Sequence, residues 1–157
     1  MSILGLAGLD PDPPLGNAIF FDIRFRLAFE DDADAARERL GVVMDPIEGI
    51  TYKKDSTLAM LWAADQRNWD IYYMTPADLY ISGGEARAHT KRLQVFRDPQ
   101  HYYELGTAED IRMGDLDVIL MRKDPPFDKE FLYTTHLLEM ADRQGAWVVN
   151  RPQSLRD

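Results

Sequence analysis

The sequence predicts an α/β protein that contains a parallel βαβ unit. Two short, continuous apolar runs, Leu40–Met44 and Val118–Met121, have the pattern of strands that are covered on both sides. A helical segment and then a further apolar run follow each of them. The order strand, helix, strand in residues 40–74 is typical of a parallel βαβ unit with a right-handed crossover.

Residues 1–36 are predicted to be an N-terminal extension rather than part of this fold. Residues 1–18 resemble a tail, because Asp10-Pro11-Asp12-Pro13-Pro14 and several glycines resist regular structure. Apolar residues then alternate with polar ones from Phe21 to Phe29, which is the pattern of a half-buried strand and would suit an added edge strand. Asp31–Leu40 is polar and is predicted to be a short connector.

The first βαβ unit is predicted to begin with the strand Leu40–Met44 and a loop at residues 45–49. Asp55 or Ser56 can cap a helix that runs to about Arg67. The rows of this helix are marked by Leu58, Leu61, Trp62 and Asp65. Trp69–Met74 is the next predicted strand.

A β-hairpin excursion is predicted in the middle of the chain. Leu79–Ile81 and Thr90–Phe96 flank Ser82-Gly83-Gly84-Glu85, and a Gly-Gly pair favours a tight reversal. Tyr102–Leu105 is predicted to be another short strand.

The C-terminal part repeats the strand and helix order. Leu116–Met121 is the strongest predicted strand, and Asp128 can cap the helix Lys129–Arg143 that follows the loop. Gly145 stands just past the end of this helix, where glycine is favoured. The last predicted strand is Trp147–Asn150, and the inward residues of the helix are predicted to be Phe131, Leu132, Leu138 and Ala141.

Composition excludes several classes of function. The 157 residues suffice for one domain with a real core, and the net charge of −9 argues against a nucleic-acid backbone or an anionic membrane as the partner. Without cysteine there is neither a disulfide framework nor a thiolate metal site, which fits a cytoplasmic protein. No apolar run approaches the roughly 20 residues of a membrane helix. The N-terminus also lacks the pattern of a secretory signal.

Polar and charged side chains follow several of the predicted strands and could form one polar rim. Asp45, Arg122, Asp124 and Asn150 stand at or beyond carboxyl ends of strands, where ligands bind in open α/β sheets. Lys54 precedes a helix N-terminus, whose partial positive charge it reinforces, as in a carboxylate or phosphate site. The same residues are also compatible with ordinary β-to-α turns that carry solvated charges. The convergence of several strand ends favours the rim.

Other sites are not indicated. The three histidines lack metal-ligand spacing, and Gly83-Gly84 lacks the context of a phosphate-binding loop. No nucleophile, histidine and acid set is evident. The residues alone therefore indicate an α/β module with a polar rim.

Five blocks of the sequence, taken together, are characteristic of one family. The blocks are Gly41–Ile47, Lys53–Leu61, Gly84–Thr90, Asp117–Asp128 and Val149–Asp157. In their order and spacing they resemble the N-terminal domain of bacterial glutathione synthetase. The resemblance runs from about Leu40 to the last residue and assigns residues 37–157 to that domain. It implies a pre-ATP-grasp, Rossmann-like fold, with a mostly parallel sheet and helices on both of its faces.

Enzymes of this family join γ-glutamylcysteine to glycine through an acyl phosphate, with ATP and magnesium, and they are typically homotetramers. The resemblance implies that ATP and magnesium are held by an ATP-grasp domain expected after Asp157 and absent from this chain. The chain alone is therefore expected not to ligate and to offer no catalytic residue of its own.

The expected role of the rim is recognition of the dipeptide. Arg122 would pair with a substrate carboxylate, which suits its planar guanidinium. Asp124 or Asp45 would accept from the substrate ammonium or orient Arg122, and Lys54 and Ser56 would add donors. The alternative is a non-catalytic module that works alone as an oligomerisation or small-peptide-binding unit. A related ATP-grasp ligase with another substrate is the third reading.

Overall fold

A seven-stranded sheet forms the centre of the computed structural model, which describes residues 37–123 and 128–149. The predicted tail and edge strand of residues 1–36, together with Asp124 and Asn150, lie outside the described residues. The strands are β1 (Arg39–Met44), β2 (Asp70–Met74), β3 (Leu79–Ser82), β4 (Glu85–Val95), β5 (Tyr103–Arg112), β6 (Val118–Arg122) and β7 (Trp147–Val149). Short 3-10 turns stand at Ile47–Gly49, Pro76–Asp78 and Met113–Asp115.

The sheet is mixed, so the prediction of a mostly parallel sheet is only partly correct. Its order is β3-β4-β2-β1-β6-β7, and β5 pairs with β4 in addition. β2, β1, β6 and β7 run parallel, whereas β4 pairs antiparallel with β2, β3 and β5. The antiparallel part follows from the hairpin at Gly83 and Gly84, whose positive φ angles of 59° and 77° suit a tight reversal. The predicted βαβ order and hairpin are thus confirmed.

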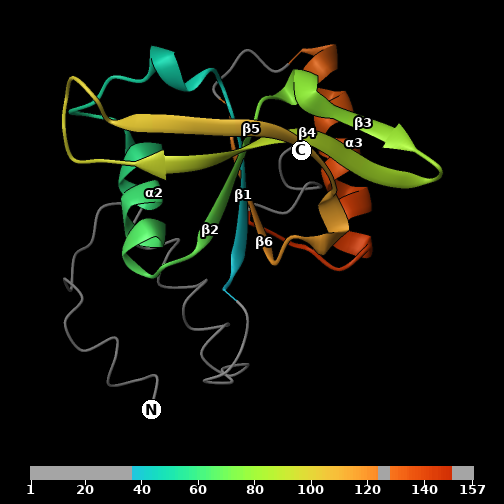
Figure 1. The fold of residues 1–157 in the computed structure, drawn as a ribbon. Coiled ribbons are helices and arrows are strands. Elements are labelled where there is room, and N and C mark those ends of the chain that lie inside the picture. The colour runs from blue at the N-terminus through green and yellow to red at the C-terminus, as the bar shows by residue number, and fades with distance from the viewer. Residues whose placement is uncertain (1–36, 124–127, 150–157) are drawn as a thin grey trace, which may run out of the picture.

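Helices α2 (Ser56–Gln66) and α3 (Lys129–Arg143) cover opposite faces of the sheet (Figure 1). Side chains of a strand alternate between faces, so β1 sends Leu40 and Val42 toward the α2 side and Val43 toward the α3 side. Asp55 caps α2 and Asp128 caps α3, each through a backbone N–H that donates to its side chain. The bounds of both helices therefore match the sequence prediction closely.

One predicted inward position is wrong, because Leu132 on α3 is 47% exposed. On α2, Asp65 is exposed, whereas Leu58 and Leu61 of the predicted rows are buried. In α3 the inner row is set by Phe131 and continues through Thr134 and Leu138, so that Leu132 is turned about 100° away from it. Leu132 thus faces outward although it is apolar. Thr134 faces inward although it is polar, and its hydroxyl donates a hydrogen bond to Glu130 O at 2.9 Å.

β4 and β5 are much longer than predicted. In the first half of β4, Ala86 and Ala88 are buried in the core under α3, whereas in the second half Leu93 and Val95 are buried in the core under α2. The strand thus passes from beneath one helix to beneath the other, and its buried positions change from even to odd numbers. Most of β5 is exposed, which explains why its polar second half gave no strand signal.

Candidate functional site

The carboxyl ends of β1 and β6 bring Asp45 and Arg122 to the same edge of the sheet. Met44 is the register partner of Arg122, so the residues that follow these two strands are neighbours. Lys123 Nζ lies 3.4 Å from Asp45 Oδ1. The side chain of Lys123 is 15% exposed and that of Asp45 is 46% exposed. Asp45 therefore pairs with Lys123, and no hydrogen bond between Asp45 and Arg122 is present among the described residues.

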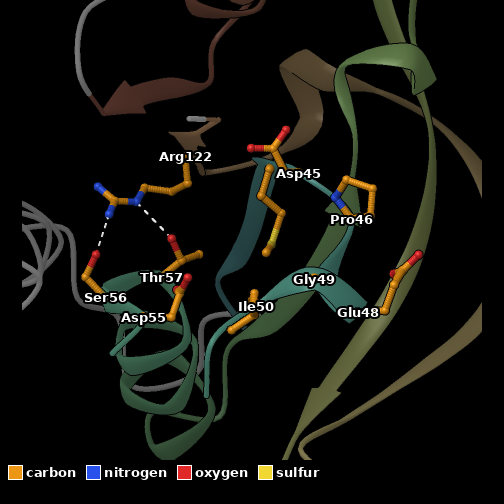
Figure 2. Close-up of a pocket in the computed structure, with 10 residues that line it drawn as sticks. Asp45, Pro46, Glu48, Gly49, Ile50, Asp55, Ser56, Thr57 and Arg122 are labelled. Carbon is orange, nitrogen blue, oxygen red and sulfur yellow. Dashed lines mark hydrogen bonds between the residues drawn. The ribbon is translucent and has the colours of Figure 1, made fainter. Parts of the chain in front are cut away.

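The first turn of α2 holds the Arg122 guanidinium. Arg122 Nε donates to Thr57 Oγ1 at 3.1 Å, and Arg122 Nη2 donates to Ser56 Oγ at 2.6 Å. The turn is fixed in its place because Asp55 Oδ1 accepts from Leu58 N at 3.0 Å. Figure 2 shows both hydroxyls on one side of the guanidinium. The chain thus presents an arginine that neutral groups orient.

A pocket of about 440 Å³ opens between the end of β1, the loop after it and the start of α2. Figure 2 shows the lining side chains, which come from these three elements and from the end of β6. Arg122 carries a positive charge, and three carboxylates of the lining carry negative charges, so the pocket contains both signs. The lining residues are Met44, Asp45, Pro46, Glu48, Gly49, Ile50, Asp55, Ser56, Thr57 and Arg122.

Three of the six predicted site residues line this pocket, namely Asp45, Ser56 and Arg122. Lys54 does not; it is exposed, and its backbone N–H closes a turn by donating to Thr51 O at 3.0 Å. Asp124 and Asn150 lie outside the described residues, so the structure leaves their predicted roles untested.

Sequence reasoning missed Thr57 and the wall formed by residues 46–50. Thr57 is only 6% exposed, and a lone threonine in a first helical turn does not by itself indicate a binding site. The signal that could have identified Thr57 is its position next to Ser56. Two consecutive hydroxyls in the first turn of a helix can both contact a side chain at the edge of the sheet. The wall residues gave no signal, because their positions depend on contacts distant in the sequence.

Metal binding finds no support in the parts of the chain that the structure describes. No group of three or more histidine, cysteine, aspartate or glutamate side chains there is arranged to hold an ion. No helix within the same ranges combines the length and apolar character that crossing a membrane requires.

Comparison with known proteins identifies relatives of most of the chain. The family model of the prokaryotic glutathione synthetase N-terminal domain matches residues 39–156. Over 119 residues the chain is 60% identical to glutathione synthetase of Pseudomonas putida, and 54% identical to those of Yersinia pestis and Escherichia coli O127:H6. The aligned part is 76% of this chain but only 37–38% of these relatives. The chain thus spans little more than a third of their length.

Proposed function

We propose that this chain, which belongs to the prokaryotic glutathione synthetase family through its N-terminal domain, supplies the wall that binds the dipeptide substrate γ-glutamylcysteine. The reaction we propose for the whole ligase joins this dipeptide to glycine with ATP. The role proposed for the present chain is narrower: its pocket recognises a carboxylate of the dipeptide and positions it. The alternative is a stand-alone, non-catalytic module for oligomerisation or small-peptide binding.

The observation that carries the proposal is the environment of Arg122. Its hydrogen-bond partners among the described residues are the hydroxyls of Ser56 and Thr57, which orient the guanidinium without neutralising its charge. Arg122 is partly buried at the pocket, where a charge attracts an opposite charge more strongly than it does in bulk water. An anionic ligand group is the natural partner of such an arginine.

The geometry of these contacts leaves donors for a ligand. Nε and Nη2 form one edge of the guanidinium, and this edge contacts Thr57 and Ser56. Nη1 donates to none of the described residues, so Nη1 and the second hydrogen of Nη2 can present the other edge to a carboxylate in two parallel hydrogen bonds. The orientation of Arg122, which the sequence suggested for Asp124 or Asp45, is proposed to come from the two hydroxyls.

Asp45 is proposed to contact the ammonium group of the dipeptide, because it lines the same pocket and is 46% exposed. Its neighbour Lys123 limits this attraction by sharing the carboxylate. A zwitterionic amino-acid end carries both charges close together, which matches a pocket with Arg122 on one side and carboxylates on another.

ATP and magnesium are not assigned to this pocket. The donor set of the described residues does not suit a magnesium ion, which prefers oxygen ligands grouped around it. We propose phosphoryl chemistry, glycine binding and homo-oligomerisation for the whole ligase and not for this pocket.

Calorimetric titration of the chain with γ-glutamylcysteine tests the proposal. Arg122→Ala should weaken binding by about 10- to 100-fold, since a hydrogen bond to a charged group contributes roughly 1.5–3 kcal/mol. Arg122→Lys should recover part of this loss, because it keeps the charge but not the paired donors.

Arg143→Ala is the matched control, because it removes the same charge from an exposed position at the end of α3. It should bind the dipeptide like the wild type. Equal weakening by both alanine variants would show that only net charge matters. Unchanged binding by Arg122→Ala, in a variant whose thermal unfolding is normal, would refute the proposal.

A further inference from the structure

The pocket wall that lies across from Arg122 is a short loop, residues 46–50. One residue of this loop, Ile47, is hydrogen-bonded from two sides. We infer that Tyr73 and Tyr102 are positioning residues, which clamp the peptide groups of Ile47 and thereby fix the pocket wall of residues 46–50; this inference rests on the proposed function. Neither tyrosine lines the pocket. Their effect on a ligand would therefore be transmitted through the loop.

The two hydroxyls contact opposite polar groups of one residue. Tyr73 Oη, from β2, accepts a hydrogen bond from Ile47 N at 3.2 Å, and Tyr102 Oη, from just before β5, donates to Ile47 O at 2.8 Å. The side chain of Ile47 is fully buried in the core under α2. Ile47 is thus held by its side chain, its N–H and its C=O together.

This residue starts the 3-10 turn that shapes the wall. Gly49 N donates to Pro46 O at 3.0 Å and Ile50 N donates to Ile47 O at 3.2 Å. Ile47 O therefore accepts from both Tyr102 and Ile50, which uses both of its lone pairs. Loss of the Tyr73 hydroxyl leaves Ile47 N without its acceptor, and loss of the Tyr102 hydroxyl leaves Ile47 O with Ile50 N as its one donor among the described residues. Either loss weakens the hold on the turn and favours its rearrangement.

Both tyrosines remain neutral hydroxyls at physiological pH. Burial raises the pKa of Tyr73 above its usual value, against the opposing effect of the bond from Ile47 N. Burial also raises the pKa of Tyr102. The donor and acceptor roles of the two hydroxyls therefore do not change near neutral pH.

The clamp also connects the wall to the helix that orients Arg122. The ring of Tyr102 packs against Tyr52 at a centroid distance of 5.9 Å, and Tyr52 packs edge-on against Trp62 of α2 at 5.5 Å. Trp62 Nε1 in turn donates to Phe96 O at 3.0 Å, at the end of β4. The aromatic contacts thus link the wall to α2, the helix whose first turn hydrogen-bonds Arg122.

The test compares Tyr73→Phe and Tyr102→Phe with Tyr52→Phe in the full chain. All three remove one hydroxyl and keep the ring, but only the first two disturb the Ile47 peptide groups. Amide hydrogen exchange at residues 47–50 reports the clamp directly, and calorimetry with γ-glutamylcysteine reports positioning. We expect about tenfold faster exchange and about 3- to 10-fold weaker binding in the two clamp variants. We expect wild-type behaviour in Tyr52→Phe.

The two readouts separate the possible failures. Exchange at residues 47–50 that is unchanged in both clamp variants would overturn the clamp. Faster exchange with unchanged dipeptide affinity would overturn the positioning role. If the wild-type chain does not bind the dipeptide at all, the proposed function and the positioning role fall together, and the exchange result still decides whether the clamp exists.

Discussion

Replacement of Gly114 by alanine should destabilise the domain, because a side chain there would collide with the end of α3. A Cβ atom built on Gly114 lies 2.7 Å from Gln144 Cβ and 2.9 Å from Gln144 O. Ordinary van der Waals contact begins at 3.4 Å, so the two segments would have to separate by about 0.7 Å. The atoms in the way belong to backbone or to its first side-chain carbon and cannot rotate aside.

Gln144 is also firmly held, so relief by its displacement is costly. Its N–H donates to Met140 O and Ala141 O at the end of α3. Its side chain accepts from Ala86 N at 3.3 Å and donates to Gly84 O at 3.2 Å. Displacing it would strain the helix end and the hairpin together. Overpacking of this kind costs about 1–3 kcal/mol.

Thermal unfolding measures this cost. A loss of about 2 kcal/mol in a domain of this size should lower Tm by roughly 5–10 °C. Gly49→Ala is the control, because its added Cβ meets nothing within 4 Å, and its Tm should differ by no more than about 2 °C. If Gly114→Ala unfolds at the same temperature as the wild type and the control, the close approach of the two segments is wrong.

Two further predictions concern a helix cap and a surface carboxyl. Asp55→Ala removes the acceptor of Leu58 N and should lower the free energy of unfolding by about 1 kcal/mol in urea titrations, whereas an unchanged midpoint would contradict the cap. The hydrogen bond from Tyr80 Oη lowers the pKa of Asp110 below its ordinary value of 3.8. Stabilisation by this carboxylate is therefore present above pH 3.8 and is lost as the pH falls through the lowered pKa. Tyr80→Phe should raise the Asp110 pKa toward its ordinary value in an NMR titration, and an identical pKa in both proteins would contradict the assignment.

The helices and the parallel strands could be predicted because their signals are local. Asp55 and Asp128 mark the helix starts within a few residues, and the apolar run at Val118 identifies a buried strand without knowledge of its neighbours. β4 could not be predicted in full, because Ala88 and Leu93 are buried on opposite faces under different helices. No single period-two pattern describes such a strand.

The candidate site likewise has one part that the sequence predicts and another part that depends on contacts distant in the sequence. Arg122 and Asp45 could be predicted from topology, because parallel strands end at one edge of the sheet. The wall could not be predicted, because the groups that hold Ile47 come from 26 and 55 residues further along the chain. The exposed position of Lys54 likewise depends on the path of a turn that its charge does not reveal.

The path of β4 has a consequence for how the domain unfolds. Ala86 and Ala88 belong to one hydrophobic core, and Leu93 and Val95 of the same strand belong to the other. If β4 detaches from one helix, buried side chains are lost from both hydrophobic cores. Neither core is therefore an independent cooperative unit. The two cores should therefore melt in one all-or-none transition. The pocket at the edge of the α2 core would then open only when the whole domain unfolds.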